Sequence, residues 1–242
     1  MIPYDQIDTI FLDVGNTLIS IDFDWIAAEL CARGFACESA ALRRAEAAAR
    51  PGYSRLLFVD GVEAGTDLFR TYLTTMFEQL DVTGRLPSSD LGDLVTELRP
   101  ILRPDGRASV LWRAVMPEVP EALARMRGRG LTLVVVSNSD GTAERSLEAA
   151  GIRPYLSAVI DSAIVGYEKP DPRIFEHALR ATGARPERTL HVGDLYHADV
   201  TGARAAGIHA LLLDPYDDWT GVDCDRAPDL RIVAAKFDRD RV

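Results

Sequence analysis

Apolar runs that stop abruptly at polar residues limit the possible folds of this sequence more than any other feature. Residues 7–12 are mostly apolar and end at Asp13, and the almost wholly apolar run 131–136 ends at Ser137. A continuous apolar run of this length is typical of a strand covered on both faces of a parallel sheet. In open α/β sheets, ligands bind at the edge where such strands end. The pattern therefore predicts a buried parallel sheet with a site at its polar strand ends.

Two later segments repeat this arrangement. A short strand is predicted at 158–160, followed by the loop that holds Lys169, and a strand at 189–192 runs into Gly193-Asp194. Helices that end at glycine separate these strands, which is typical of an alternating α/β chain. We interpret 208–213 as the last clear strand and the acidic segment after it as an irregular, solvated edge with a little closing structure.

Residues 20–110 are predicted to form a run of helices inserted between the first strand and the rest of the sheet. Apolar residues recur at spacings of three and four in 62–80 and again in 91–102, which indicates helices that pack on one another. Another helix is predicted over 38–50, ending before Pro51-Gly52. We therefore expect a sheet-containing part, residues 1–19 and 111–242, and a helical part, residues 20–110.

Composition excludes several classes of function. The formal charge of −10 argues against non-specific binding of nucleic acid, which needs a basic surface, but it allows a small anionic substrate in a local site. No window approaches the roughly 18 uninterrupted apolar residues of a membrane span, and the start of the chain lacks the form of a signal peptide. The cysteines are odd in number and lack CxxC spacing, so a disulfide framework is not expected. We expect a cytoplasmic protein that binds neither nucleic acid nor a membrane.

The polar segments resemble, in type and in order, the four motifs of the haloacid dehalogenase superfamily, most of whose members are phosphatases. The matching residues are Asp13-Val14-Gly15-Asn16-Thr17, then Ser137, then Lys169, and finally Gly193-Asp194 with Asp199. The match covers essentially the whole chain, because the helical part is similar in place and size to the superfamily's inserted cap. The resemblance implies an α/β fold with a Rossmann-like parallel-sheet core, 1–19 and 111–242, and an inserted α-helical cap, 20–110.

The resemblance also implies a mechanism of phosphoryl transfer. Asp13 would attack phosphorus to form an aspartyl-phosphate, a known form of nucleophilic catalysis by a carboxylate. Lys169 would keep the nucleophile ionised and stabilise the charge of the transition state. Ser137, with the Asn138 amide, would donate hydrogen bonds to the same phosphoryl oxygens as Lys169.

A Mg²⁺ site is implied at the same edge of the sheet. Mg²⁺ prefers octahedral oxygen ligation and keeps several waters. The Asp13 carboxylate, the Gly15 backbone carbonyl and Asp194 would supply ligands and leave room for waters and a phosphate oxygen. Asp199 would complete the set by orienting a metal-bound water or Lys169.

Gly15 departs from the superfamily's pattern, because its phosphatases typically carry a second Asp there as general acid and base. A positioned acid or base is typically worth about 10² to 10⁴ in rate. Three explanations are open. The substrate has a good leaving group, such as an acyl phosphate; or His197, Asp22 or Asp24 takes the role; or turnover is slow or absent, and the protein binds phosphorylated ligands.

Other branches of the superfamily provide alternatives. Metal-independent 2-haloacid dehalogenases also lack the second Asp, but they do not carry a Gly-Asp fourth motif, so Gly193-Asp194 favours a Mg²⁺ enzyme. Phosphonate-cleaving members use a cap lysine, and the only lysines here, Lys169 and Lys236, lie outside 20–110, which excludes that activity.

The leading prediction is a Mg²⁺-dependent phosphomonoesterase that acts on a small phosphorylated metabolite. A metal-independent 2-haloacid dehalogenase and a weakly active or inactive regulatory protein that binds phospho-ligands are the alternatives. Within the cap, Trp25, Tyr53 and Arg55 are candidates for contact with the substrate.

Overall fold

The computed structural model describes residues 1–80, 88–104 and 110–238, and the chain divides into two compact units. Unit 1 comprises Met1–Ser20 and Arg113–Val242, and unit 2 comprises Ile21–Trp112. The division falls within two short paired strands, β2 (Ile19–Ile21) and β3 (Trp112–Val115). The sequence pattern did not predict this pair, since strands of three and four residues carry too few positions for a period to show.

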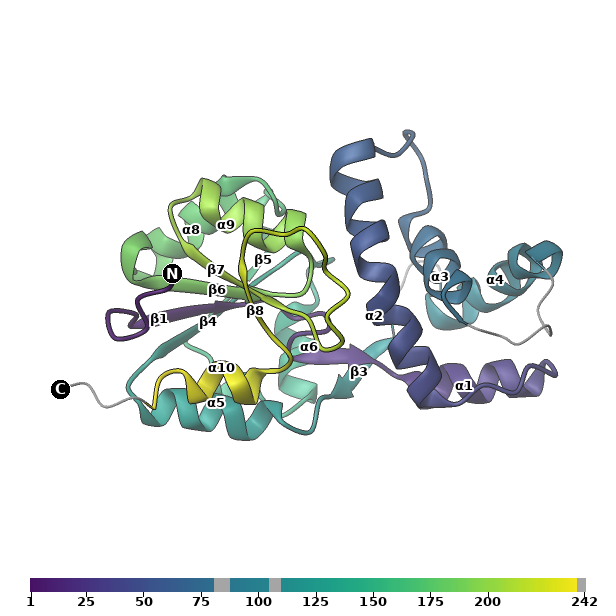
Figure 1. Cartoon of the computed structure of the whole chain (residues 1–242), viewed down its shortest axis with the longest axis horizontal. Helices are drawn as coiled ribbons and strands as arrows, with labels where there is room; N and C mark the ends of the chain where they lie inside the picture. The colour runs from purple at the N-terminus through teal and green to yellow at the C-terminus, as the bar shows by residue number, and fades with distance from the viewer. Residues whose placement is uncertain (81–87, 105–109, 239–242) are drawn as a thin grey trace. The chain divides into compact units, whose positions relative to one another are not determined.

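Unit 1 is built on a six-stranded sheet in the order β5-β4-β1-β6-β7-β8 (Figure 1). Neighbouring strands are parallel throughout. The strands are β1 (Thr9–Leu12), β4 (Thr132–Ser137), β5 (Ala158–Asp161), β6 (Thr189–Gly193), β7 (His209–Leu213) and β8 (Asp225–Ala227). The chain leaves β1 for one side of the sheet and returns through β6 on its other side. The carboxyl end of β1 is therefore the topological switch point, where ligands bind in this class of sheet.

Helices cover both faces of the sheet, as expected for an α/β fold. The helices α5 (Val119–Gly128) and α10 (Leu230–Ala235) pack together on one face, and α8 (Pro172–Thr182) and α9 (Gly202–Ala205) lie on the other (Figure 1). The short helices α6 (Ala143–Ala149) and α7 (Ser162–Val165) flank β5. Phe11, Val134 and Phe175 are fully buried in the core between β1, β4 and α8, and burying each such side chain stabilises the fold by about 1.5–3 kcal/mol.

Local signals at both ends of α8 fix the segment that follows Lys169. Asp171 caps the helix by accepting a hydrogen bond from the Arg173 N–H at 2.9 Å, and Pro172 occupies the first helical position. Gly183 ends the helix in the left-handed conformation, with φ +67°. Both ends agree with the sequence-based prediction, so the loop before α8 is held by a well-defined helix start.

The closing structure of the C-terminal segment consists of a strand and a helix. Residues 208–213 are not the last strand, because β8 adds to the sheet beside β7, with Leu212 opposite Arg226, and α10 follows. The strand β8 has the sequence Asp-Arg-Ala, in which only Ala227 is buried. Such a segment has no hydrophobic pattern, and its pairing with β7 defines it as an edge strand.

Unit 2 is helical, as predicted, but two of its helix boundaries differ from the prediction. Its helices are α1 (Phe23–Ala32), α2 (Ser39–Arg55), α3 (Leu68–Glu78) and α4 (Ser88–Leu102), with a π-helical turn at Leu56–Asp60. The helix α3 begins later than predicted because Gly61 and Gly65 adopt left-handed backbone conformations that break the chain. Asp67 then caps α3 by accepting hydrogen bonds from two of its first N–H groups.

The helix α2 continues through Pro51, where we predicted that it would end. A proline inside a helix costs about 3 kcal/mol, because it removes a backbone hydrogen bond and crowds the preceding turn. The side chains of Glu46, Arg50 and Ser54, spaced by four residues, are all buried. The buried face of α2 therefore extends across the proline, and its packing against α3 offsets the cost.

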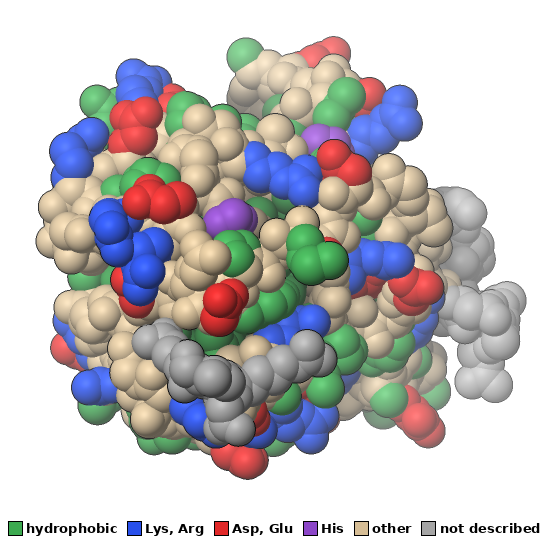
Figure 2. All heavy atoms as spheres, turned by 60° about the vertical axis from the view of Figure 1, so that its left-hand side comes forward, with side chains coloured by type: hydrophobic (Ala, Val, Ile, Leu, Met, Phe, Trp, Pro, Cys, Tyr) green, Lys and Arg blue, Asp and Glu red, His purple; other side chains and the backbone are tan. Residues whose placement is uncertain are grey.

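Within the described residues, no helix is both long and apolar enough to cross a membrane. Acidic and basic side chains are interspersed over the face shown in Figure 2. The acidic side chains on that face do not form a single patch, although the net charge of the chain is −10.

Candidate functional site

The register of the sheet brings the polar strand ends to one edge. Leu12 of β1 lies opposite Val135 of β4 and opposite Val192 of β6. The Asp13 N–H donates to the Val192 carbonyl at 3.0 Å, which extends the β1–β6 pairing to Asp13 itself. The residues that follow Leu12, Val135 and Val192 therefore lie near one another where the three strands end.

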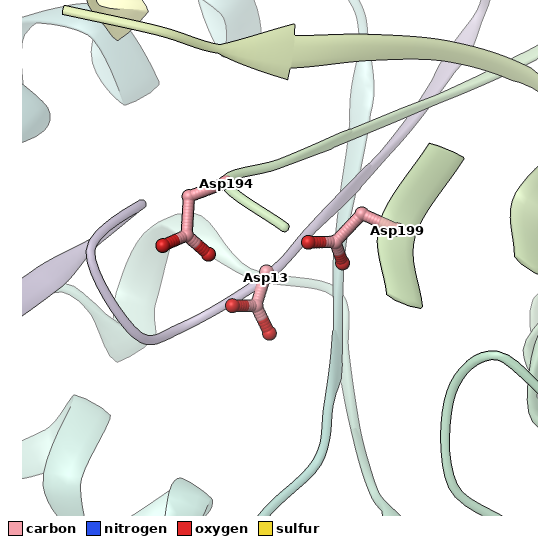
Figure 3. A group of neighbouring side chains, drawn as sticks. All are labelled: Asp13, Asp194 and Asp199. Atoms are coloured by element: carbon pink, nitrogen blue, oxygen red, sulfur yellow. The ribbon is translucent and has the colours of Figure 1, made fainter. Parts of the chain in front are cut away.

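Three buried carboxylates converge at this edge. Figure 3 shows the side chains of Asp13, Asp194 and Asp199 grouped near the end of β1. One oxygen from each lies within 4.8 Å of the others. Asn16, which adopts a left-handed backbone conformation with φ 51°, donates its side-chain Nδ2–H to Asp194 Oδ2 at 3.3 Å. The loop after β1 thus contributes both a carboxylate and a donor that orients another carboxylate.

The Lys169 ammonium joins two of these carboxylates. Its Nζ donates to Asp13 Oδ1 and to Asp199 Oδ1, both at 2.7 Å, and the side chain is only 3% exposed. Burial by itself lowers the pKa of Lys169, but the charges of Asp13 and Asp199 outweigh that effect, and the pKa is raised above its usual value. Lys169 therefore remains charged at neutral pH.

Asp199 is held by three donors. Its Oδ1 accepts from Lys169 and also lies 2.9 Å from His191 Nε2, and its Oδ2 accepts from the Leu195 N–H at 2.9 Å. Burial acts to raise the pKa of Asp199, but the Lys169 charge and the His191 hydrogen bond more than compensate, so the pKa is lowered. Gly193 makes room for this carboxylate, because a Cβ there would come within 2.2 Å of Asp199 Cγ. A larger residue at position 193 would therefore displace Asp199.

The backbone of Lys169 is fixed by Asn138. The side-chain Nδ2–H of Asn138 donates to the Lys169 carbonyl at 2.9 Å, and the Lys169 N–H donates to Asn138 Oδ1 at 2.6 Å. The side-chain amide of Asn138 is thus engaged with the lysine loop. Ser137 is buried at the end of β4, where it pairs with Asp161 of β5. Phosphate binding by Ser137 and by the Asn138 amide stays a prediction.

Asp161 and His191 are site-supporting residues that the sequence analysis missed. Asp161 accepts hydrogen bonds from the N–H groups of Gly141 and Ala143, both at 3.1 Å, and so holds the loop that follows Ser137. The signal for Asp161 was present, since it ends an apolar strand as Asp13 does. His191 lies inside an apolar run, where an isolated polar residue gives no sign of its partner.

The loop around Gly15 is tightly folded. The carbonyl of Val14 accepts hydrogen bonds from the Leu18 N–H at 2.9 Å and the Ile19 N–H at 3.0 Å. Gly15 itself forms an isolated backbone bridge with Ile19. This folding keeps Gly15 close to Asp13. The role of the Gly15 carbonyl as a metal ligand stays a prediction.

The candidates for the missing acid have structural partners. Asp22 caps α1 by accepting from the Trp25 N–H at 2.9 Å, and Asp24 accepts a hydrogen bond from Ser39. His197 lies in a π-helical turn at Tyr196–Thr201, with its ring 5.3 Å from that of Tyr196. A catalytic role for any of the three stays a prediction.

The three cap candidates also make contacts within unit 2. Trp25 donates its Nε1–H to the side chain of Glu29 at 3.2 Å, the Tyr53 hydroxyl donates to the Leu68 carbonyl at 3.3 Å, and Arg55 pairs with Asp60 at 3.3 Å. These two hydrogen bonds and one ion pair explain where the three side chains lie without a substrate. Contact with a substrate stays a prediction for each of them.

The charge of the cluster fits a divalent cation. Asp13, Asp194, Asp199 and Lys169 together carry two more negative charges than positive ones. Buried charge that is not compensated is strongly unfavourable. The donor atoms are all oxygens, which hard cations prefer. These residues can therefore hold a metal ion, and Asp199 is the carboxylate whose oxygens are already contacted by three protein groups.

Comparison with known proteins agrees with this geometry. The haloacid dehalogenase-like hydrolase family model matches residues 7–207. The haloacid dehalogenase-like hydrolase domain-containing protein 3 of Bos taurus is 42% identical over 102 residues, which are 42% of this chain and 40% of that protein. The phosphoserine phosphatase of Thermus thermophilus is 41% identical over 117 residues, 48% of this chain and 46% of that protein. The aligned segments thus span less than half of each of these two relatives.

The solved structures show the same fold. The HAD-hydrolase YfnB from Bacillus subtilis superposes with a TM-score of 0.63 at 17% identity, covering 96% of this chain and 99% of that one. The matched residues 7–207 include Asp13, Lys169 and Asp199. The family predicted from the motifs is confirmed, and we conclude that this chain belongs to the haloacid dehalogenase-like hydrolase family.

Proposed function

We propose that this protein is a Mg²⁺-dependent phosphomonoesterase that acts on a small phosphorylated metabolite. The observation that carries the proposal is the Lys169 ammonium, 2.7 Å from the Asp13 carboxylate, in a cluster that also contains Asp194. The name of the Thermus thermophilus relative, phosphoserine phosphatase, supports a phosphorylated substrate. The chemistry that we propose for this site is phosphoryl transfer, which depends mainly on positioning and on neutralising charge.

Asp13 is the nucleophile in this proposal. Its carboxylate oxygen forms a bond to phosphorus while the bond from phosphorus to the leaving oxygen breaks, which gives an aspartyl-phosphate and an alcohol once the leaving oxygen has taken up a proton. Water then attacks phosphorus, the bond to Asp13 breaks, and inorganic phosphate and the free carboxylate are released. The ammonium of Lys169, 2.7 Å from this carboxylate, lowers the electrostatic repulsion between Asp13 and the phosphoryl group.

Ser137, the Asn138 amide and Lys169 bind the phosphoryl oxygens in this proposal. Because the side chain of Asn138 is bonded to the backbone of Lys169, its backbone N–H is the group that we assign to the substrate. Donors placed where charge develops stabilise the transition state more than the ground state.

The Asp13 carboxylate, the Gly15 carbonyl and Asp194 would hold Mg²⁺. When bound, the ion neutralises charge on the phosphoryl oxygens and aligns them with the nucleophile. We propose that Asp199 holds the Lys169 ammonium and does not bind the metal directly, because three protein groups already contact its two oxygens. Asn16 would fix the orientation of Asp194.

Gly15 restricts the substrate in this proposal. No carboxyl group at position 15 can protonate the leaving oxygen, so we infer that the preferred substrates have good leaving groups, as acyl and aryl phosphates do. We further propose that residues 1–19 and 111–242 act as the catalytic core and that residues 20–110 act as a cap that selects the substrate.

The proposal is tested by hydrolysis of an aryl phosphate with and without Mg²⁺, in the wild type and in Asp13→Asn. We expect phosphate release that requires Mg²⁺ and is abolished by the substitution. Release of halide from a 2-haloacid without metal would replace the proposal with a dehalogenase. Binding of phosphate ligands without any turnover would replace it with a ligand-binding protein.

A further inference from the structure

His191 is a fully buried polar side chain in the centre of β6. Its Nε2 lies 2.9 Å from Asp199 Oδ1, and the edge of its ring packs against Phe175, with ring centroids 4.9 Å apart. Its Nδ1 is buried and has no hydrogen-bond partner in the described part of the chain. Because an unpaired buried nitrogen is unfavourable, the contact at Nε2 is the interaction that accounts for a histidine at this position.

The contacts of the ring define its hydrogen-bonding form. Asp199 is ionised beside Lys169, so its oxygens can only accept hydrogen bonds. His191 Nε2 must therefore carry the proton that it shares with Asp199. A charged ring would also carry a proton on Nδ1, where no acceptor lies within the described residues. The geometry thus corresponds to a neutral imidazole that donates from Nε2.

The same carboxylate oxygen of Asp199 accepts from His191 and from Lys169. His191, Asp199, Lys169 and Asp13 consequently form one buried chain of hydrogen bonds. Removal of the His191 donor would leave the Asp199 carboxylate with two of its three contacts, those from Lys169 and from the Leu195 N–H, and so would loosen one of the two anions that locate the ammonium. The position of Lys169 relative to Asp13 therefore depends on His191 through Asp199.

Close packing keeps this chain rigid. A Cβ at position 202 would lie 2.9 Å from the Phe175 ring and 2.9 Å from Pro170 Cα. Gly202 thus lets α9 approach both the ring that covers His191 and the proline next to Lys169. At Gly193, a Cβ would lie 2.2 Å from Asp199 Cγ, so this glycine leaves room for the carboxylate that His191 contacts. Two glycines are therefore required at this packing density, which leaves His191 little freedom to move.

We propose that His191 is a positioning residue whose neutral ring donates its Nε2 proton to Asp199 and thereby holds the Lys169 ammonium against Asp13. The proposal deepens the phosphatase function and rests on it for its effect on turnover. His191 itself touches neither the substrate nor the nucleophile.

The first test compares His191→Leu with His191→Gln in the hydrolysis of an aryl phosphate. Leucine removes the donor, whereas the side-chain N–H of glutamine reaches a similar distance from the backbone. We expect kcat to fall about 10- to 100-fold in His191→Leu, as for other residues that orient a catalytic group, with KM nearly unchanged. We expect His191→Gln to recover most of the loss. Full activity in His191→Leu, or equal loss in both variants, would overturn the proposal.

A matched control separates positioning from loss of stability. Leu190 precedes His191 in β6 and is fully buried, but its side chain projects to the opposite face of the sheet. Leu190→Ala should lower the midpoint of thermal unfolding without lowering kcat below the unfolding transition. An equal loss of kcat in Leu190→Ala would assign the effect of His191→Leu to general destabilisation and overturn the proposal.

A second measurement does not depend on turnover. The ¹⁵N chemical shifts of the His191 ring distinguish the two neutral tautomers and the charged ring. We expect a protonated Nε2 and an unprotonated Nδ1, and the other tautomer or a charged ring would overturn the proposal. If the wild type released no phosphate at all, the proposed function would fail, whereas the tautomer would still decide whether His191 donates to Asp199.

Discussion

The ammonium of Lys169 lies 2.7 Å from the carboxylate of Asp13, although 156 positions separate the two residues along the chain. Asp199 also accepts a hydrogen bond from the ammonium at 2.7 Å, and Asn138 holds the lysine's backbone. Lys169 is thus fixed at both its backbone and its side chain. A lysine restrained in this way can act on the nucleophile and the phosphoryl group without reorganising.

Substitution of Lys169 by methionine should remove charge stabilisation from the transition state. Loss of one such donor typically lowers kcat by about 10² to 10³, and we expect a loss of that size in hydrolysis of an aryl phosphate. The control is Lys236→Met, which removes the only other lysine; Lys236 lies 5.3 Å from the ring of Tyr4. Wild-type turnover in Lys169→Met would show that the ammonium has no part in catalysis.

Substitution of Gly193 by alanine should displace Asp199, because the new Cβ would lie 2.2 Å from its Cγ. Overpacking of this kind costs about 1–3 kcal/mol of unfolding free energy, and kcat should fall as well. Gly128→Ala is the control, since a Cβ there would meet no atom within 4 Å beyond its chain neighbours and the backbone of its own helix. We expect that control to keep full activity and to gain no more than about 1 kcal/mol. Equal behaviour of both variants, measured by urea unfolding and by kcat, would refute the packing account.

Alkaline pH should weaken unit 2 through Tyr53. Burial raises the pKa of Tyr53 from 10.0 to about 12, against a smaller opposing effect of Arg103. Because the folded protein holds this proton more tightly than the unfolded chain, the contribution of Tyr53 is present below pH 10 and is lost as pH rises from 10 toward 12. Urea unfolding near pH 9 and near pH 11 should show that Tyr53→Phe loses less stability than the wild type. Equal losses would mean that Tyr53 is not buried as described.

Replacement of Gly15 by aspartate should restore an acid beside the nucleophile. If the missing proton donor limits turnover, Gly15→Asp should speed hydrolysis of an alkyl phosphate by up to about 10² to 10⁴. Hydrolysis of an aryl phosphate should change much less, because its leaving group needs little protonation. The ratio of the two kcat values is the measurement, and an unchanged ratio would point to a substitute acid or to a different slow step.

The sequence predicted the central part of the sheet and the meeting of its polar strand ends because both depend on the same signal. An apolar run that stops at a polar residue defines a buried strand and its end, and parallel pairing then brings Asp13, Lys169 and Asp194 to one edge. The motif order identified the family, which the family match confirmed. No prediction of distances was needed for this step, since the topology alone brings the strand ends together.

The parts that could not be predicted are those decided by tertiary contact. The edge strand β8 is defined by its pairing with β7, and α2 passes through Pro51 because its buried face continues beyond it. His191 resembles any polar residue inside a strand until its contact with Asp199 is seen. Such features depend on partners that are distant in the sequence, so local patterns carry no trace of them.

The central claim is that Asp13 attacks phosphorus, and its most direct test is to trap the phosphorylated enzyme. The protein would be quenched with acid during turnover of an aryl phosphate with Mg²⁺, and the peptide that contains Asp13 would be analysed by mass spectrometry. We predict one added phosphoryl group on that peptide, which is absent without Mg²⁺ and absent in Asp13→Asn. Undiminished phosphate release by Asp13→Asn, or a phosphoryl group on another residue, would contradict the account.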